Sequence, residues 1–423
     1  MLLSTTIQIR KTRALSESTP ENPPPAPRDR GSLNEVFWAF FKLGLTSFGG
    51  PIAHLGYYRE QLVVRRRWLD EATFADLVAL CQFLPGPASS QVGFSLGVLR
   101  GGGLLGGLAA WFAFTAPSAI IMFAFALASG HFTGPLAQGF LHGLKLVAVA
   151  VVAQAVCGMA RSLAPDLTRA CIAIAAFAVV VLLGGTFAQI GAIALGALAG
   201  LWLCRSEASA VSGRLNFPVT RGAGATALAL FTALLLLSPV VTAATGSHGI
   251  AMFDAFYRSG ALVFGGGHVV LPLLQAEVVT PHWVGNAEFL SGYGLAQAVP
   301  GPVFTFAAYL GAVMSMPPNG LAGAAIALVA LLLPGMLLVY GMLPFWDAFR
   351  TRASAQAAMR GTNAAVVGIL AAALYRPVWP SAIFGITDLV LALAGFLLLV
   401  VWKVPSWVVV LLLAAAGTLS VLI

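Results

Sequence analysis

Two long uncharged stretches limit what this chain can fold into. Residues 104–128 and 289–346 contain no Asp, Glu, Lys or Arg. Each stretch exceeds the roughly 20 apolar residues that one helix needs to cross a bilayer. Only 9% of all residues are charged, against about 25% in a soluble domain. We therefore expect an all-α polytopic membrane protein.

The N-terminus has a different composition. Residues 1–35 are polar and rich in proline, and they lack the apolar core of a cleavable secretory signal. Segments of this kind bury too little apolar surface to fold. We expect residues 1–35 to form a disordered cytoplasmic arm.

An internal repeat divides the rest of the chain. FKLGLTSFGG at 41–50 matches YRSGALVFGG at 257–266, and QFLPGP at 82–87 matches QAVPGP at 297–302. The offsets are 216 residues (257 minus 41) and 215 residues (297 minus 82). Self-similarity in which order and spacing are kept indicates duplicated structural units.

The repeat predicts the domain organisation. The first repeat covers residues 36–204, a basic linker and a connecting helix cover 205–252, and the second repeat covers 253–423. One extra apolar helix, at about 222–245, lies between the repeats. An odd helix between two equivalent units turns the second unit upside down. Inverted-topology repeats are typical of secondary transporters.

Loop charges suggest that some apolar segments do not cross the membrane. Positive residues in short loops favour the cytoplasmic side. With thirteen crossings and a cytoplasmic N-terminus, the loop at 57–71, which holds four arginines, would fall outside. The disagreement disappears if each FGG and PGP segment enters the membrane and returns on the same side. We then expect nine full spans and four re-entrant or broken segments; thirteen full spans are the alternative.

The Pro-Gly-Pro triplets should break helices. Proline lacks an N–H donor and pushes the preceding residue out of the helical region. One half-helix should end near Leu84 and another should begin near Ala88. Broken backbone at membrane depth is tolerated where it lines a cavity, and a helix that begins there directs free N–H groups at an anion. Two inverted repeats would bring such breaks together near the midplane.

Candidate substrate-binding residues are the glycines and prolines of the breaks, the polar residues beside them, and cations in apolar segments. They are Lys42, Gly49, Gly50, Gln82, Pro85, Gly86, Pro87, Ser89, Ser90, Lys145, Arg258, Gly265, Gly266, Gln297, Pro300, Gly301, Pro302 and Thr305. Snorkelling to the membrane interface is the alternative for Lys42 and Arg258.

Five titratable residues near the breaks are candidates for proton coupling. They are His54, Glu60, Asp76, His268 and Glu277. Ionisable residues inside apolar segments are often functional. A structural role is the alternative for the two histidines, and solvated or interfacial pairing is the alternative for the carboxylates.

Other classes of function find no support in the sequence. The four cysteines lie in apolar segments without CxxC spacing, which fits packing roles. GGG at 101–103 and at 265–267 is not followed by GK[ST], which excludes a phosphate-binding loop. We find no nucleophile elbow and no metal-ligand spacing, so we expect a protein that is not an enzyme and has no metal or cofactor. The net charge of +8 reflects loop placement rather than a nucleic-acid partner.

The motif series FGG, Trp, Gln-x-x-PGP occurs in both halves, in FGGPIAHLGYYREQLVVRRRWLDEATFADLVALCQFLPGP at 48–87 and in its echo at 264–302. In these residues the chain resembles the chromate ion transporter (CHR) family in its long, two-domain form. The second half departs from the first, since Gly267 replaces Pro51 and the triple arginine at 65–67 has no counterpart.

The resemblance implies a function. It implies a multi-pass protein of the bacterial inner (plasma) membrane that exports chromate as a secondary transporter, driven by the proton gradient. The expected partners are chromate or a similar oxyanion and the lipid bilayer, and a homodimer is kept open as the assembly. A carrier of sulfate or of another oxyanion or organic anion is the alternative.

Overall fold

The computed structural model describes residues 31–129, 134–205, 217–264, 267–349 and 352–421. Within these ranges the regular structure is helical, and no strand occurs. Residues 1–30 of the predicted arm lie outside the described residues. Its predicted boundary at residue 35 falls inside the first helix, which begins at Leu33 after Ser32 caps it by accepting a hydrogen bond from the Glu35 N–H group.

The first repeat contains eight α-helices and one π-helix within the described residues. They are α1 (Leu33–Thr46), α2 (Gly50–Tyr58), η1 (Arg59–Arg65), α3 (Glu71–Phe83), α4 (Ala88–Arg100), α5 (Leu104–Ser129), α6 (Pro135–Leu163), α7 (Leu167–Leu183) and α8 (Gly185–Leu203). The connecting helix is α9 (Arg221–Thr245).

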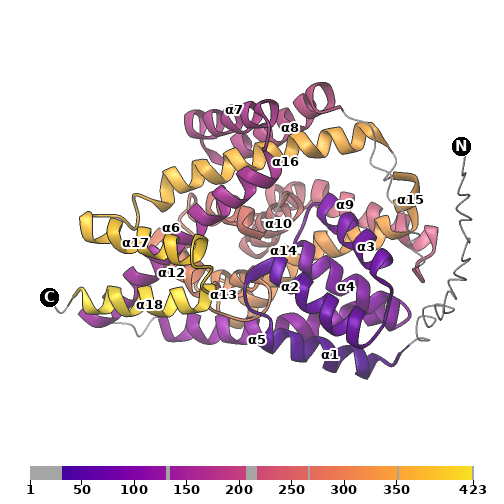
Figure 1. Ribbon diagram of the computed structural model, residues 1–423, viewed down its shortest axis with the longest axis horizontal. Coiled ribbons are helices and arrows are strands. Elements are labelled where there is room, and N and C mark those ends of the chain that lie inside the picture. The colour runs from indigo at the N-terminus through magenta and orange to yellow at the C-terminus, as the bar shows by residue number, and fades with distance from the viewer. Residues whose placement is uncertain (1–30, 130–133, 206–216, 265–266, 350–351, 422–423) are drawn as a thin grey trace, which may run out of the picture.

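The second repeat follows the same plan with shorter pieces. Its elements are α10 (His248–Ala261), η2 (Gly267–Val269), α11 (Val270–Val278), α12 (Asn286–Ala296), η3 (Val303–Thr305), α13 (Phe306–Ala312), α14 (Gly320–Met342), η4 (Leu343–Phe345), α15 (Trp346–Phe349), α16 (Ala353–Ala373), η5 (Leu374–Val378), α17 (Ile386–Val400) and α18 (Ser406–Leu419). Figure 1 shows α16 of the second repeat running beside α7 and α8 of the first.

Long apolar helices confirm the polytopic membrane fold. Five of the described helices are long and apolar enough to cross a bilayer: α5, α6, α9, α14 with η4, and α16 with η5. The other four predicted spans correspond to α7, α8, α17 and α18, which have 17, 19, 15 and 14 residues. The count of nine full spans therefore stays a prediction for these four.

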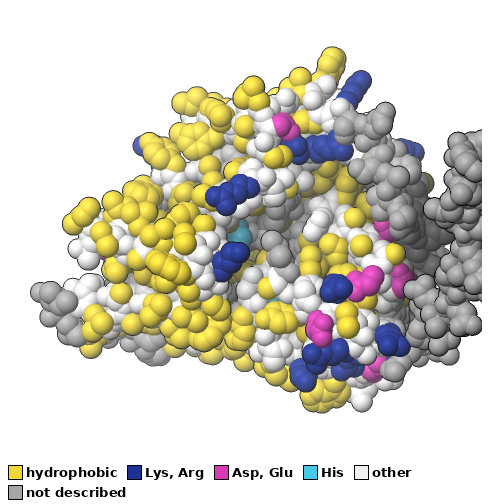
Figure 2. Space-filling view, in the orientation of Figure 1, with side chains coloured by type: hydrophobic (Ala, Val, Ile, Leu, Met, Phe, Trp, Pro, Cys, Tyr) yellow, Lys and Arg dark blue, Asp and Glu magenta, His cyan; other side chains and the backbone are white. Residues whose placement is uncertain are grey.

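The outer surface suits lipid. Leu182, Phe187 and Trp202 are 80%, 87% and 79% exposed, which would be costly in water and is favourable in hydrocarbon. In Figure 2 hydrophobic side chains cover the region of α17 and α18, whereas many of the charged side chains gather near α1 and α4.

The FGG and PGP segments of the first repeat return to the face from which they enter. Arg100 at the end of α4 pairs with Glu35 at the start of α1 at 2.9 Å, and the Trp68 indole N–H, in the loop between the segments, donates to Glu35 at 3.2 Å. Helix α1 has 14 residues, or about 21 Å, against about 30 Å of hydrocarbon. We call the face that carries these three residues the α1 face.

The second repeat has the same arrangement. The His248 ring at the start of α10 lies 4.7 Å from the ring of Trp283, in the loop between α11 and α12. The Trp283 carbonyl accepts a hydrogen bond from the Ser315 N–H group, beyond α13, at 3.0 Å. These three residues define the α10 face. In each repeat, the start of the FGG segment, the end of the PGP segment and the loop that joins the two segments meet at one face. Thirteen full crossings do not fit this geometry.

The two faces lie on opposite sides of the molecule. Helix α5 begins four residues after Arg100 on the α1 face. Near its other end, Phe125 stacks on Tyr309 at 5.6 Å, and the Tyr309 hydroxyl donates to the carbonyl of Glu288, at the start of α12, at 3.3 Å. Since α5 spans from one face to the other, the re-entrant segments of the two repeats enter from opposite sides. This arrangement is the one expected for inverted repeats, and the inverted topology stays a prediction.

Both repeats pack their last re-entrant helix by the same close contact. A Cβ atom added at Gly97 of α4 would lie 2.4 Å from the carbonyl oxygen of Gly106 of α5. A Cβ atom at Gly311 of α13 would lie 2.1 Å from the carbonyl oxygen of Gly323 of α14. Small residues allow such backbone approaches in membrane proteins. The equivalent pairs therefore fix each PGP segment against a long spanning helix.

Candidate functional site

Four breaks interrupt the re-entrant segments within the described residues. In the first repeat, α1 and α2 are separated by residues 47–49, and α3 and α4 by residues 84–87. In the second repeat, the breaks follow Ala261 and Ala296. The sequence predicts that one helix ends near Leu84 and the next begins near Ala88, and in the structure α3 ends at Phe83 and α4 begins at Ala88. Gly86 and Gly301 adopt φ values of 120° and 93°, which L side chains rarely reach.

The breaks meet across the two repeats. The Gly86 N–H group donates to the Val263 carbonyl at 2.7 Å, and the Gly301 N–H group donates to the Ser47 carbonyl at 2.8 Å. These two hydrogen bonds are equivalent under the repeat, since 47 plus 216 is 263 and 86 plus 215 is 301. Each PGP break is thus joined to the FGG break of the other repeat, and the four breaks form one junction.

The long spanning helices close around this junction. A Cβ atom at Gly86 would lie 3.0 Å from Cα of Gly335 on α14, and one at Gly301 would lie 2.8 Å from the Ser118 hydroxyl on α5. Ser118 and Gly335 each follow the proline inside their helix, Pro117 and Pro334. The break glycines are therefore required both by backbone conformation and by space.

The FGG segments also touch one another. A Cβ atom at Gly267 would lie 3.3 Å from Cγ of Pro51 and 3.4 Å from the ring of Phe304. Gly267 is the residue that replaces Pro51 in the second repeat. The departure from the repeat pattern has a packing reason, because Pro51 takes up the space that a side chain at 267 would need.

Gln91 closes the first PGP break. Its amide Nε2 donates to the carbonyls of Pro85 at 2.9 Å and Gly335 at 3.0 Å, and its side chain is buried. The repeat places Phe306 at the equivalent position (91 plus 215), so only the first repeat has this amide. Gln91 lies in the first turn after the break, and the sequence does not predict that it bridges to α14.

Six of the buried polar atoms that have no hydrogen-bond partner among the described residues lie on the break segments or next to them. All belong to residues that are at most 7% exposed. They are Ser47 Oγ, His54 Nε2, Ser90 Oγ, Gln91 Oε1, Thr115 Oγ1 and Gln297 Nε2. Buried polar groups are nearly always hydrogen-bonded. The junction therefore has the donors and acceptors that a polar ligand or water would use.

The two candidate histidines have parallel structural roles. His54 Nδ1 lies 3.4 Å from the Ser89 hydroxyl, which joins α2 to the first turn of α4. His268 Nδ1 lies 2.8 Å from the Tyr293 hydroxyl, which joins η2 to α12. Each histidine links the FGG segment to the PGP segment of its own repeat, although the two do not align in the repeat. Their role in proton coupling stays a prediction.

The predicted cations lie in three different environments. Lys42 is exposed on α1. Lys145 is partly buried on α6, next to Leu144, whose carbonyl lies against Gly294 of α12. Arg258 pairs with the two carboxylates described below. The structure thus does not gather these cations in one cluster, and their role as substrate ligands stays a prediction.

Arg258 belongs to a buried ionic cluster. Its Nη2 atom lies 2.9 Å from Glu277 Oε2 and 3.2 Å from Asp254 Oδ2. The Ser238 hydroxyl of α9 donates to Asp254 Oδ1 at 2.5 Å. We call Asp254, Arg258 and Glu277 the acidic triad, because two carboxylates share one guanidinium. Sequence reasoning named Arg258 and Glu277 separately and missed Asp254, although its spacing of four residues from Arg258 places both on one helix face.

The remaining candidates are dispersed. Gln82 is exposed, while its counterpart Gln297 is buried. Glu60 forms an exposed ion pair with Arg65 at 2.8 Å, and Asp76 is buried on α3. The Thr305 hydroxyl donates to the Pro302 carbonyl at 2.8 Å within its own turn.

The prolines line the junction to different depths, and the glycines of the FGG motifs are only partly described. Pro87 and Pro302 are buried, and Pro85 and Pro300 are partly buried. Gly49 and Gly50 have positive φ values of 99° and 78°. Gly265 and Gly266 lie outside the described residues. In the described ranges, no group of three His, Cys, Asp or Glu residues is placed to hold a metal ion.

Comparison with known proteins identifies the family. The chromate transporter family model matches residues 34–201 and 250–418. The chain is 29% identical to the chromate transport protein of Pseudomonas aeruginosa over 419 residues, which cover 96% of this chain and 95% of that protein. It is 31% identical over 355 residues to a protein of Synechococcus elongatus named "Probable chromate transport protein", covering 81% and 84% of the two chains.

A relative of lower identity also matches. An uncharacterised transporter of the archaeon Methanocaldococcus jannaschii is 24% identical over 352 residues, which cover 82% of this chain. No solved structure matches. The relatives are named as transport proteins and not as enzymes. With both repeats matched, this chain belongs to the chromate transporter family.

Proposed function

We propose that this chain is a secondary active transporter that exports chromate across the bacterial inner membrane. The observation that carries the proposal is the pair of equivalent hydrogen bonds, from Gly86 to Val263 and from Gly301 to Ser47. They hold four backbone breaks together where the inverted repeats meet. Inverted-repeat transporters bind their substrate at such interfaces, with broken helices aimed at it.

The first repeat supplies the stronger anion site. Helices α2 and α4 begin directly at the breaks, at Gly50 and Ala88, and have 9 and 13 residues. A helix N-terminus acts as roughly half a positive charge and offers free N–H groups. The breaks of the second repeat lead first into the 3₁₀ turns η2 and η3. A tetrahedral dianion such as chromate would therefore bind closer to the first repeat, with Ser89 and Ser90 as further donors.

The acidic triad is the proposed site of proton coupling. Asp254 and Glu277 share one cation in a buried setting, so protonation of one carboxylate would leave a neutral pair and remove one net negative charge. The equivalent positions in the first repeat are Trp38, Lys42 and Gln61 (254, 258 and 277 minus 216), which carry no carboxylate. Coupling would thus belong to the second repeat and anion binding mainly to the first.

A related oxyanion is the second candidate substrate. The donors at the junction are backbone N–H groups and hydroxyls, which respond to the charge and shape of a tetrahedral oxyanion and not to its central atom. Sulfate has the same charge and shape, so we expect it to compete with chromate. We place the N-terminus on the cytoplasmic side, with the α1 face and its arginines. The homodimer stays a prediction.

Uptake into everted membrane vesicles tests the proposal. We expect chromate to accumulate when the vesicle interior is acidified, to accumulate less when the pH gradient is collapsed, and to be displaced by sulfate. The control is a Gly86→Ala, Pro87→Ala variant that inserts normally and should not transport. Vesicles containing the wild-type chain that take up no more chromate than empty vesicles would overturn the proposed function.

A further inference from the structure

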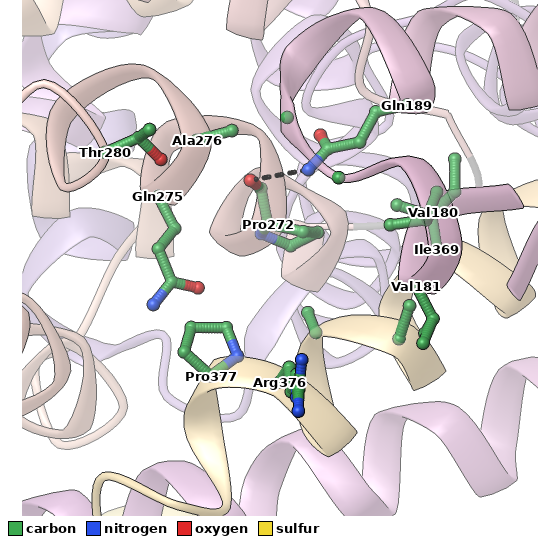
Figure 3. Close-up of a pocket in the computed structure, with 14 residues that line it drawn as sticks. Val180, Val181, Gln189, Pro272, Gln275, Ala276, Thr280, Ile369, Arg376 and Pro377 are labelled. Atoms are coloured by element: carbon green, nitrogen blue, oxygen red, sulfur yellow. Dashed lines mark hydrogen bonds between the residues drawn. The ribbon is translucent and has the colours of Figure 1, made fainter.

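A cavity of about 260 Å³ lies apart from the four breaks. Figure 3 shows the residues that line it. It is formed by the turn between α7 and α8, by α11, and by the end of α16 with η5. Gln275 of α11 connects it to the α10 face, because its Nε2 donates to Asn286 Oδ1 at 2.9 Å and Asn286 in turn donates to Ser381. None of the lining residues belongs to a break.

Arg376 supplies a cation to this cavity. Its backbone, with φ −144° and ψ 122°, interrupts the helical run of η5, which turns the residue out of the α16 helix. Its guanidinium lies over the ring of Tyr375 at 6.0 Å. Arg376 is exposed at the rim of the cavity, and none of the described residues that line the cavity is a carboxylate that could neutralise its charge.

The start of α8 adds to the positive potential. Gly184 and Gly185 line the cavity and have φ values of 66° and 74°. No atom lies within 4 Å of a Cβ position at either glycine, so the backbone is open to a ligand. Helix α8 has 19 residues, and its first N–H groups have no partner within the helix. An anion is favoured at such an end.

The side-chain oxygen of Gln189 is a hydrogen-bond acceptor, which indicates that the ligand carries a hydrogen-bond donor. The Gln189 side chain is 6% exposed, and its Nε2 donates to the Pro272 carbonyl at 3.1 Å, as Figure 3 shows. Its Oε1 atom is buried and has no hydrogen-bond partner among the described residues. A ligand that satisfies this oxygen must donate a hydrogen bond as well as carry negative charge.

We infer that this cavity binds a tetrahedral oxyanion group with an adjacent hydrogen-bond donor. Arg376 and the start of α8 contact the charged oxygens, and Gln189 Oε1 accepts the hydrogen bond. Two sources have this chemistry. One is a free oxyanion that carries a hydroxyl, such as hydrogen phosphate; the other is an aminophospholipid, whose phosphate lies close to its ammonium group. Tyr375 and Trp379 are exposed beside the cavity, and such aromatic residues mark the level of the head groups.

Binding measurements test this site without relying on chromate transport. We would purify the full chain in detergent and measure the affinity for radiolabelled inorganic phosphate and the phospholipid phosphorus that co-purifies per chain. Arg376→Gln removes the cation, and Gln189→Glu replaces the acceptor by an anion of the same size. The matched control is Arg221→Gln, which removes an exposed arginine at the start of α9.

The outcomes separate the two sources. If a free oxyanion binds, Arg376→Gln and Gln189→Glu each weaken phosphate binding by about tenfold or more. Gln189→Leu then weakens phosphate binding by about fivefold and leaves sulfate, which has no hydroxyl at neutral pH, unchanged. If a lipid binds, the two charge variants lose about one phospholipid per chain while phosphate binding stays the same.

The inference is overturned if neither quantity changes in Arg376→Gln and Gln189→Glu. It is also overturned if Arg221→Gln causes the same loss, because total charge would then explain the effect. Should Arg376→Gln fail to fold, as judged by its thermal transition, Arg376→Lys keeps the charge but not the planar fork of donors and should show a partial loss of the same quantity.

Discussion

The Gly86→Ala substitution tests the junction at its tightest point. Gly86 has a φ of 120°, and its N–H group donates to Val263 of the other repeat at 2.7 Å. A Cβ atom there would lie 2.9 Å from the Gln91 amide and 3.0 Å from Cα of Gly335. The amide belongs to a side chain and can move, but the Gly335 backbone cannot move without shifting α14.

The expected cost follows from these contacts. A non-glycine residue in a sparsely populated backbone region costs about 1–3 kcal/mol. If the backbone relaxes by losing the hydrogen bond to Val263, a buried donor is left unsatisfied at about 1–3 kcal/mol more. In the proposed function the junction opens and closes during each transport cycle. The substitution would shift the equilibrium between these two states by a sizeable part of this free-energy cost. Since about 1.4 kcal/mol corresponds to a factor of ten, we expect chromate uptake to fall by at least about tenfold.

Two control glycines separate the possible causes. Gly158 of α6 has open space at its Cβ position, so Gly158→Ala should leave uptake unchanged. Gly246 also has open space but a positive φ of 63°, so Gly246→Ala measures backbone strain alone. Gly301→Ala should be milder than Gly86→Ala, because its nearest neighbour is the Ser118 hydroxyl, which can rotate away.

The assay is chromate uptake into everted vesicles, normalised to the amount of protein in the membrane. Thermal transitions of the purified variants report folding separately. Wild-type uptake by the Gly86→Ala variant would refute the claim that the junction between the repeats takes part in transport. An equal loss in Gly158→Ala would show that the assay responds to any change in a membrane helix.

Further predictions address coupling, topology and local stability. Glu277→Gln should keep chromate binding but make uptake independent of the pH gradient, and unchanged gradient dependence would remove the acidic triad from the coupling mechanism. In a chain without native cysteines, Arg66→Cys should react with an impermeant reagent only in everted vesicles and Thr280→Cys only in right-side-out vesicles; the opposite pattern would invert the proposed orientation. Burial raises the pKa of the Asp70 carboxyl, but hydrogen bonds from the Thr73 N–H and hydroxyl groups outweigh this effect and lower it. This stabilisation is present above the usual pKa and is lost as the pH falls through the lowered value, so Asp70→Ala should lose about 1 kcal/mol at neutral pH and less in acid, as measured by thermal unfolding.

Much of the architecture could be predicted from the sequence, because helix breaks and loop charges are local signals. Pro85 and Pro87 forbid helix on their N-terminal side, so the end of α3 and the start of α4 could be located to a residue. The four arginines between 57 and 71 indicated the re-entrant segments. The side of the membrane on which a loop lies determines its charge, and this signal does not depend on tertiary contacts.

Contacts between the repeats could not be predicted in the same way. The hydrogen bond from Gly86 to Val263 joins backbone atoms, and backbone pairing far apart in the chain leaves no trace in side-chain pattern. The equivalent residues Gln82 and Gln297 differ in burial, and the Ser406 hydroxyl of α18 donates to the Gln297 carbonyl at 3.0 Å.

The sequence predicts an anion-binding role for some side chains whose charge is used elsewhere. Arg258 aligned with Lys42 in the repeat, which suggested a shared role for the two cations. The structure surrounds Arg258 with Asp254 and Glu277, while Lys42 is exposed on α1. Glu277 lies 19 residues beyond Arg258 (277 minus 258), across a break, so no helical spacing could connect them.

Protection of a cysteine at the junction by substrate tests the central claim most directly. In an active chain without the four native cysteines, Ser90→Cys would place a thiol in the first turn of α4, beside the break. We predict that chromate and sulfate slow its reaction with a small anionic thiol reagent, that chloride does not, and that Arg66→Cys is unaffected. A Ser90→Cys chain that transports chromate but reacts at the same rate with and without chromate would contradict the claim that the oxyanion binds where the four breaks meet.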